Sequence, residues 1–306
     1  MMAAPRDRIV STVGAVVVNH DAGEALITCV ASLLGDGVHD VVVVDNASTD
    51  ASADLLEQRH PEVRVVRTGR NLGYGAGANR GLALLDEELV LVCNPDVVVH
   101  AGAVPVLAQA LSARPDAALA GPCILESDGS RYPSARRFPS WVDAAGHAVL
   151  SPLRPDNRFT RRYKMTDLDS SVTTSVDWVS GACFVARRAA LSALGGFDER
   201  YFMYLEDTDL CWRARRAGYS VLYVPQAVVA HTQGLSTARR PYRMLVAHHR
   251  SALRFAGRTT TGWRRTALPV VALVLGLRLV AVAMRQALAG RRLAPSGRQR
   301  GVGAAD

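Results

Sequence analysis

Short, solid apolar runs alternate with segments of helical spacing over the first hundred residues. Thr12 to Val18, Val41 to Val44 and Leu89 to Cys93 are apolar and mostly β-branched, which is typical of buried strands. Between them, Glu24 to Leu34 and Ala51 to Arg59 are expected to be helices. Strands without polar alternation are typical of a sheet that is covered on both faces. The pattern therefore predicts an α/β fold with a mostly parallel, Rossmann-like sheet flanked by helices.

The same alternation predicts further elements along the chain. Asp128 to Ser175 is the exception, because it is rich in Arg, Pro, Ser and Asp and lacks a strong period, so we expect long loops over the site there. The remaining predicted strands are Val63 to Arg67, Asp177 to Val185 and Val221 to Val224, and the remaining predicted helices are Ala78 to Leu85, Arg187 to Leu194 and Glu206 to Ala217.

Composition divides the chain into two parts. The chain has 306 residues, of which 49% are apolar, enough for one large domain and an appendage. From Thr232 onward there are fourteen Arg and one acid, whereas the rest carries a net charge of −5. We therefore expect a catalytic domain over residues 1–232 and a basic tail over residues 233–306 with an anionic partner. Five separate cysteines without a CxxC pair predict buried, reduced thiols, and the charged Met1 to Ser11 does not resemble a signal peptide.

The basic tail contains one long apolar segment. Ala267 to Met284 has eighteen residues and a single charge, Arg278, which is close to the lower limit for crossing a bilayer. Pro269 and Arg278 count against a span, so we favour a helix that lies in the cytoplasmic leaflet with Arg on anionic headgroups. The alternative is a helix packed on the enzyme or on a second subunit, as in a homodimer. No recognition motif accompanies the arginines, so no nucleic-acid partner is expected.

Three polar clusters follow predicted strands, where open α/β sheets bind their ligands. The first, Asp45 to Asp50, is suited to a nucleobase and ribose, although an Asx turn before a helix has the same sequence. The second cluster, Asn71 to Asn79, is glycine-rich. It would either let the backbone approach a phosphate or form an ordinary loop. The candidate nucleotide-binding residues of these two clusters are Asp45, Asn46, Ser48, Asn71, Gly73, Gly77 and Asn79.

The third cluster, Asn94 to Asp96, is suited to a divalent cation. Magnesium and manganese take oxygen ligands, often a carboxylate together with phosphates. Glu206 and Asp207 open a predicted helix beside aromatic residues; they either cap the helix or supply a general base of raised pKa. His231 follows the last strand and is a candidate metal ligand.

Taken together, these motifs resemble the family 2 glycosyltransferases, which have the glycosyltransferase A fold. The resemblance runs from about Thr12 to His231. It rests on VVVDNASTD, NLGYGAGANRG, CNPD and GGFDERYFMYLEDTDLCWRARRAGY. Two further segments, SDGSRYPSARRFPS from Ser127 and DWVSGACFVARR from Asp177, are similar to the rhamnosyltransferase branch of that family.

The resemblance implies a role for each matching residue. Asp45 would contact the pyrimidine, and Asp96 would hold Mg²⁺ or Mn²⁺ with His231 nearby, although Asn94 stands where the family motif has its first acid. Asp207 would be the catalytic base and Glu206 its companion. Trp178 and Gly181 would line the acceptor side.

The implied reaction is an inverting transfer of L-rhamnose from dTDP-β-L-rhamnose to N-acetylglucosaminyl diphosphopolyprenol, the arabinogalactan linker of a cell wall. It would take place on the cytoplasmic side of the plasma membrane, with the protein bound as a peripheral or monotopic enzyme. Three alternatives remain open: another hexosyltransferase of surface polysaccharide assembly, a nucleotidyltransferase, and a non-catalytic sugar-nucleotide binder.

Overall fold

The computed structural model describes residues 12–138, 154, 156–165, 168, 171–232 and 241–293. The chain forms two compact units, Met1–Arg239 and Arg240–Asp306. The first contains all the candidate site residues. The predicted charged start, Met1 to Ser11, lies outside the described residues, as do both ends of the basic tail.

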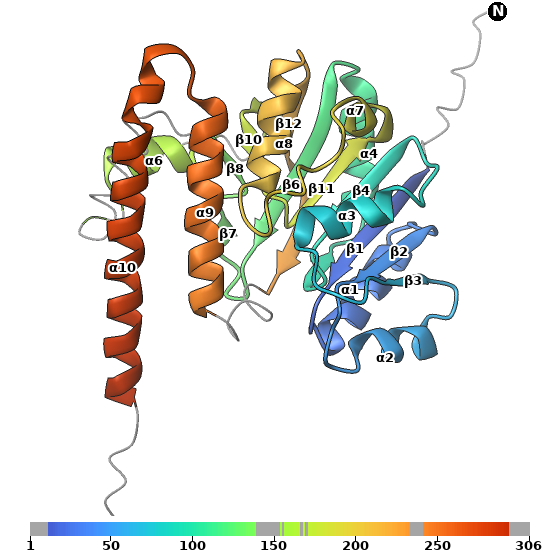
Figure 1. Ribbon diagram of the computed structural model, residues 1–306. Helices are drawn as coiled ribbons and strands as arrows, with labels where there is room; N and C mark the ends of the chain where they lie inside the picture. Colours follow the sequence, from blue (N-terminus) through green and yellow to red (C-terminus); the bar gives the residue numbers. More distant parts are fainter. Residues whose placement is uncertain are drawn as a thin grey trace, which may run out of the picture. The chain divides into compact units, whose positions relative to one another are not determined.

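Four parallel strands form the N-terminal half of the central sheet. They are β1 (Val13–Asn19), β2 (Val41–Asp45), β3 (Arg64–Arg67) and β4 (Leu89–Cys93), in the order β3-β2-β1-β4 (Figure 1). Asn19 pairs with Asp45 in the β1–β2 register, so these strands end side by side. The polar residues that follow them therefore gather at one edge of the sheet.

The second half of the sheet mixes directions. β11 (Cys183–Arg187) runs antiparallel between β4 and β6 (Ala117–Leu125), and β6 pairs in parallel with the long β12 (Ser220–His231). The antiparallel edge strand is β5 (Val97–Val99). Since six of the eight strands along the sheet share one direction, the prediction of a mostly parallel sheet is confirmed. The short strands β7 (Arg131–Tyr132) and β9 (Thr174–Val176) extend it, and β8 (Ala135–Arg136) pairs with β10 (Trp178–Val179) in a separate ribbon.

Helices cover both faces of the sheet. Alternate residues of β1 point to opposite sides, so that Val17 joins one buried cluster and Val16 the other. One cluster includes residues of α1 (Glu24–Gly35), α2 (Ser52–Arg59) and α4 (Ala103–Ala113), and the other includes residues of α3 (Tyr74–Leu82), α7 (Arg188–Ala193) and α8 (Glu206–Arg216).

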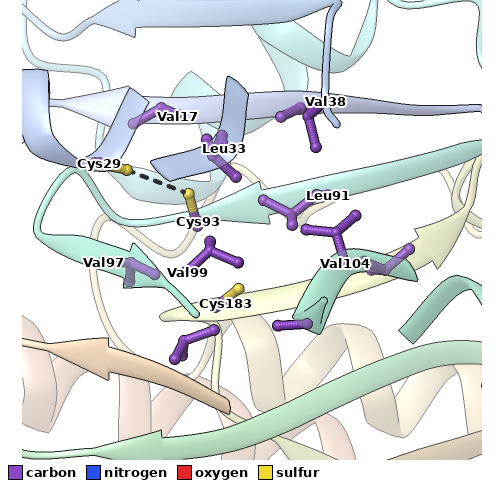
Figure 2. Packing of buried hydrophobic residues seen from close by; sticks show 14 of the residues in the cluster. Val17, Cys29, Leu33, Val38, Leu91, Cys93, Val97, Val99, Val104 and Cys183 are labelled. Atoms are coloured by element: carbon purple, nitrogen blue, oxygen red, sulfur yellow. Dashed lines mark hydrogen bonds between the residues drawn. The ribbon is translucent and has the colours of Figure 1, made fainter. Parts of the chain in front are cut away.

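All five cysteines are buried free thiols, as predicted. Figure 2 shows Cys29 of α1 facing Cys93 at the end of β4, with their sulfur atoms 3.9 Å apart. That separation is a contact between thiols and far longer than a disulfide bond. The thiols pack among valines and leucines and therefore act as small apolar side chains.

Three segments differ from the sequence prediction. The helix expected from Ala78 begins at Tyr74, inside the glycine-rich stretch. The strand expected over Asp177–Val185 is interrupted at residues 180–182, between β10 and β11. Within the region predicted as long loops, the structure has β7, β8, β9 and α6 (Arg158–Lys164). These elements are two to seven residues long, too short to produce a recognisable period.

The second unit, described by itself, is a helical hairpin. α9 (Pro241–Thr259) is followed by the 3₁₀ helix η1 (Gly262–Ala267) and by α10 (Leu268–Leu293). The apolar helix predicted over Ala267 to Met284 is therefore present and longer than expected. Gly262–Arg285 is long and apolar enough to cross a membrane by length and composition, and an eighteen-residue window within it has a mean hydropathy of 2.4.

Candidate active site

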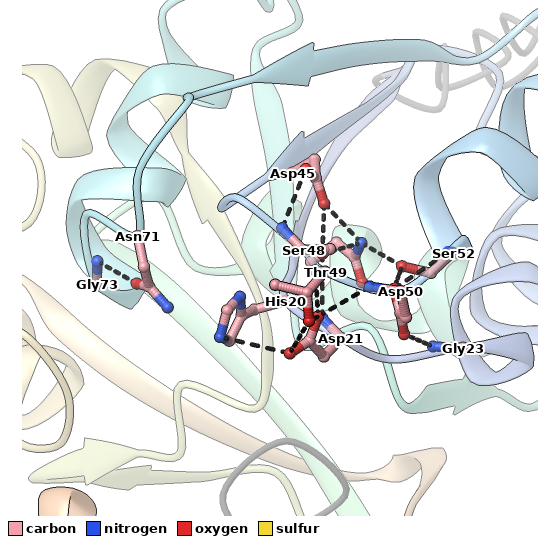
Figure 3. A network of polar contacts seen from close by, with 11 residues as sticks. His20, Asp21, Gly23, Asp45, Ser48, Thr49, Asp50, Ser52, Asn71 and Gly73 are labelled. Carbon is pink, nitrogen blue, oxygen red and sulfur yellow. Dashed lines mark hydrogen bonds and ion pairs between the residues drawn. The ribbon is translucent and has the colours of Figure 1, made fainter. Parts of the chain in front are cut away.

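Asp45 is held by side chains from two neighbouring strand ends (Figure 3). Its Oδ1 accepts hydrogen bonds from Asn19 Nδ2 at 3.0 Å and from Ser48 Oγ at 2.5 Å. Asn19 also donates to Ser52 Oγ at 2.9 Å, at the start of α2. The carboxylate is 5% exposed. The sequence analysis missed Asn19, although its place at the end of β1 could have identified it.

A second carboxylate organises the same loop and was also missed. Asp21 accepts hydrogen bonds from the Thr49 backbone at 2.5 Å and the Asp50 backbone at 3.3 Å. Asp50 accepts in turn from the Gly23 backbone at 2.9 Å. Both Asp21 and Ala47 have positive φ angles, of 53° and 60°. Backbone strain of this kind is typical of loops whose shape serves a binding site.

Asn46 joins the first polar cluster to the second. Its Nδ2 donates to the Gly73 carbonyl at 2.9 Å, and its Oδ1 accepts from the Leu72 backbone at 3.2 Å. Gly73 has a φ of 91°, and a Cβ there would lie 2.3 Å from the Phe202 carbonyl oxygen. Asn71 is exposed, and its side chain accepts from the Gly73 N–H. Asn46 and Asn71 thus fix the turn that leads into α3.

The other residues of the glycine-rich segment are packed against the protein. A Cβ on Gly77 would lie 2.9 Å from Val18, so this glycine lets α3 approach β1 closely. Asn79 donates to the Phe197 carbonyl at 2.9 Å and accepts from the Phe197 N–H at 2.9 Å. Its Nδ2 also contacts Glu199 at 3.1 Å. Asn79 therefore connects α3 to the segment before α8.

The third cluster brings together Asn94, Asp96 and His231, as expected from the sequence. His231 Nε2 lies 3.1 Å from Asp96 Oδ1 and 3.2 Å from Asn94 Nδ2. The His231 side chain is 10% exposed and its Nδ1 has no hydrogen-bond partner within the described residues, while Asp96 is 9% exposed. The pairing of β12 with β5 places His231 opposite Val97, next to Asp96. Within the described residues, no group of three or more His, Cys, Asp or Glu side chains is arranged to hold a metal.

Asp207 lies at the start of α8 and is partly exposed. Its Oδ2 accepts from the Gly181 N–H at 2.8 Å, and its Oδ1 accepts from the Thr208 N–H at 2.7 Å. Burial of its surroundings raises the pKa of Asp207, while these hydrogen bonds and the charge of Arg136 oppose the increase. A carboxylate with a pKa closer to neutrality is a stronger general base.

Glu206 has the same chemical group in a different environment. It is 5% exposed, and its Oε2 has no hydrogen-bond partner among the residues that the structure describes. Burial, with a further contribution from the charge of Asp207, raises the pKa of Glu206 well above its ordinary value. Tyr204 and Leu205, just before α8, have φ angles of 67° and 65°. The two adjacent acids are therefore distinct: both carboxylate oxygens of Asp207 accept from N–H groups, whereas burial dominates the environment of Glu206.

The sequence analysis also missed Arg136. Its guanidinium lies 5.1 Å from the centre of the Trp178 ring, 5.2 Å from that of Tyr132 and 5.6 Å from that of Tyr163. The Trp178 ring is 6% exposed, and its Nε1 donates to the Arg137 carbonyl. Trp178 thus packs against the positively charged guanidinium of Arg136 beside Asp207. The Asp207 side chain packs directly against Gly181, since a Cβ at residue 181 would lie 3.2 Å from Asp207 Oδ2.

Comparison with protein families identifies the enzyme class of this chain. The model described as "Glycosyltransferase like family 2" matches residues 11–245. This chain belongs to glycosyltransferase family 2. It is also 44% identical over 239 residues to the N-acetylglucosaminyl-diphospho-decaprenol L-rhamnosyltransferase of Mycobacterium tuberculosis, covering 74% of this chain and 78% of that relative. The chain is therefore a glycosyltransferase, as its motifs predicted.

Solved structures agree on the fold. The mannosyltransferase PcManGT from Pyrobaculum calidifontis, in complex with GDP-Man and Mn²⁺, is similar with a TM-score of 0.56 and 16% identity, over 93% of this chain and 80% of that one. The GalNAc-T7 structure with UDP, GalNAc and Mn²⁺ is similar with a TM-score of 0.57 and 17% identity, over 75% and 45%. The predicted glycosyltransferase A fold is confirmed.

Proposed function

We propose that this glycosyltransferase moves L-rhamnose from dTDP-β-L-rhamnose to N-acetylglucosaminyl diphosphopolyprenol with inversion. The observation that carries the choice of sugar and acceptor is the 44% identity to the mycobacterial L-rhamnosyltransferase. The site is suited to the reaction, because it places a candidate base and a candidate cation site in one domain. Transfer of another hexose remains the rival outcome of the experiment below.

The donor nucleotide would lie at the ends of β1 and β2. Asp45 Oδ2 has one long hydrogen bond, 3.3 Å from the Ser48 N–H, so it retains the capacity to accept from the pyrimidine N3–H. Asn19 and Ser48 hold the carboxylate in place, and Asn46 fixes the neighbouring turn. Pre-formed hydrogen bonds of this kind reduce the entropy that binding must otherwise overcome.

Asp96 and His231 fit a divalent cation shared with the donor diphosphate. Magnesium and manganese sites at phosphates commonly use only one or two carboxylates, the remaining ligands being phosphate oxygens and water. A carboxylate and an imidazole 3.1 Å apart form such a partial ligand set, and the buried His231 Nδ1 has no competing partner in the described residues. Asn94 stands beside them. When bound, the cation would supply positive charge for the leaving diphosphate.

Asp207 would remove the proton from the acceptor hydroxyl, and the resulting oxygen would attack the anomeric carbon from the face opposite the diphosphate. The N–H groups of Gly181 and Thr208 fix the orientation of the carboxylate for this transfer. Burial raises the pKa of Glu206 well above its ordinary value, which disfavours a second negative charge beside the base. Attack in a single step inverts the anomeric centre, giving an α-linkage.

The test offers purified protein a prenyl-linked N-acetylglucosaminyl diphosphate, Mg²⁺ or Mn²⁺, and four donors in parallel: dTDP-rhamnose, UDP-glucose, UDP-galactose and GDP-mannose. We expect rhamnose incorporation alone. Asp207→Asn should reduce kcat at least a hundredfold, because an amide cannot accept the proton, while dTDP binding is retained. Transfer from another donor would refute the sugar assignment. An Asp207→Asn variant with full activity would refute the assignment of the base.

We also propose that the α9–α10 hairpin binds an anionic membrane surface on the cytoplasmic side. The exposed apolar side chains of α10 recur at intervals of three or four residues, which places them on one face of the helix. Arg278 is the only charged residue between Val270 and Met284. It is partly buried and close enough to His248 of α9 for an electrostatic interaction. The exposed stripe comprises Val270, Leu273, Val274, Leu277, Val280 and Met284.

The charge of the hairpin favours a lipid surface over a second copy of the chain. Residues 241–293 contain ten arginines and no acid, so pairing two hairpins would bring like charges together. In a vesicle flotation assay, we expect the protein to float with phosphatidylglycerol vesicles and to float only weakly with phosphatidylcholine vesicles. The Leu273→Ser/Leu277→Ser variant should lose binding to the phosphatidylglycerol vesicles. Resistance to alkaline extraction would contradict surface binding and indicate a span. Dimerisation that depends on the same leucines would assign the stripe to a subunit interface.

A further inference from the structure

A basic pocket lies apart from the nucleotide-binding residues. It has a volume of about 420 Å³ and is lined by Arg137, Arg158, Arg161, Arg162, Met165 and Leu168. The described lining residues include four guanidinium groups and two apolar side chains, but no carboxylate. None of them was a candidate site residue in the sequence analysis, although Arg137 lies in the segment SDGSRYPSARRFPS that carried the family resemblance.

The local fold gathers these arginines. Arg158, Arg161 and Arg162 are spaced at i, i+3 and i+4 along α6, which places them on one side of the helix. Asn157 caps α6 by accepting from the backbone N–H groups of Phe159 and Thr160, both at 3.0 Å. These arginines therefore concentrate positive charge on one side of α6, which favours the binding of an anion there.

The pocket is connected to the base through short contacts. The Arg137 N–H donates to the Tyr163 carbonyl of α6 at 3.1 Å, and the Arg137 carbonyl accepts from Trp178 Nε1 at 3.0 Å. Trp178 precedes Gly181 by three residues, and Gly181 donates to Asp207. The backbone of Arg137, beside the pocket, is thus connected through Trp178 to the turn that holds Asp207.

We infer that this pocket binds the diphosphate and the first isoprene units of the acceptor lipid. The inference rests on the proposed function, in which the acceptor carries a diphosphate one sugar ring away from the reacting hydroxyl. Guanidinium groups match phosphate oxygens in bidentate geometry, which suits the four arginines to a diphosphate. Met165 and Leu168 supply apolar contacts where the lipid chain begins.

The first experiment measures binding and does not require turnover. Farnesyl diphosphate is titrated into the full chain by calorimetry, with dTDP present and divalent cations absent so that the donor site does not capture the probe. We expect Arg158→Gln/Arg161→Gln to weaken binding at least tenfold. The control Arg59→Gln/Arg114→Gln, which removes two exposed arginines from ion pairs elsewhere in the same unit, should bind within twofold of wild type.

Two results of that titration would overturn the inference. One is equal binding by the Arg158→Gln/Arg161→Gln variant and wild type. The other is equal affinity for inorganic pyrophosphate and farnesyl diphosphate, which would refute the apolar contribution of Met165 and Leu168. Loss of phosphatidylglycerol vesicle binding as large as the loss of farnesyl diphosphate binding would assign the pocket to bulk anionic lipid instead.

The second experiment measures kinetics. The double variant should raise the KM for the acceptor at least tenfold and leave the KM for the donor within twofold. Unchanged acceptor KM with normal turnover would overturn the pocket while the proposed function stands. Absence of transfer by wild type would refute the proposed function, and the farnesyl diphosphate titration would still decide whether the pocket binds prenyl diphosphates.

Discussion

Glu206 gives a prediction about stability that follows from its burial. The side chain is 5% exposed, Oε2 has no hydrogen-bond partner in the described part of the chain, and burial holds the pKa of Glu206 well above the ordinary value of a glutamate. The folded protein therefore keeps this proton at pH values where the unfolded chain has lost it. Since the folded state binds more protons in that window, stability decreases as pH rises, by about 1.4 kcal/mol for each pH unit.

The perturbation is Glu206→Gln, which removes the titrating proton and nearly preserves the shape. The buried glutamine adds an N–H group that destabilises the folded state by an amount independent of pH. The test therefore uses the change with pH in the difference in unfolding free energy between variant and wild type, and not the size of that difference at one pH. From pH 5 upward, the stability of the variant relative to wild type should increase by about 1.4 kcal/mol per pH unit until Glu206 ionises in the folded protein.

The assay is urea unfolding of the ligand-free protein at pH 5, 6, 7 and 8, followed by circular dichroism. Asp86→Asn is the control, because Asp86 is exposed and its surroundings change little on folding. Parallel stability curves for Glu206→Gln and wild type would refute the reasoning, since they would show that Glu206 is ionised in both states. A diverging curve for Asp86→Asn would indicate a general charge effect.

Two glycine substitutions test the close approaches in the site. Gly73→Ala should destabilise the protein by about 2–4 kcal/mol in urea unfolding, because its Cβ would lie 2.3 Å from the Phe202 carbonyl oxygen at a φ of 91°. Gly69→Ala, at a φ of 72° with open space around it, should cost only about 1 kcal/mol, and equal costs would contradict the steric account. Gly181→Ala should lower kcat about ten- to a hundredfold without changing dTDP affinity, because its Cβ would lie 3.0 Å from the Cβ of Asp207; unchanged kcat would show that the base does not depend on this fit.

The strands and the strand-end clusters could be predicted because both follow from local rules. β1, β2 and β4 are runs of branched apolar residues, and polar side chains at their ends must share an edge once the strands are parallel. The proximity of Asp96 and His231 was expected because both are candidate metal ligands at strand ends, and the family resemblance implied the same. The register of β12 against β5 brings these residues together across 135 positions of sequence, and no local pattern encodes it.

The glycine-rich segment shows where a local pattern is ambiguous. Glycines allow a backbone to approach either a phosphate or another part of the protein. Gly77 packs against Val18, and Asn79 is bonded to Phe197, so much of this segment serves packing. Arg136 was missed for the opposite reason. Its significance depends on rings from Tyr132, Tyr163 and Trp178, which only the folded chain brings together.

One turn connects the parts of the site. At residues 180–182, the Gly181 N–H donates to Asp207, and the Gly181 carbonyl accepts from Tyr74 of α3 at 2.6 Å. The next carbonyl, that of Ala182, accepts from the Asn94 N–H at 2.9 Å. The proposed base Asp207, the glycine-rich helix and the candidate cation site are therefore hydrogen-bonded to adjacent residues of one backbone segment. A displacement of this turn would therefore move Asp207 relative to Asn94.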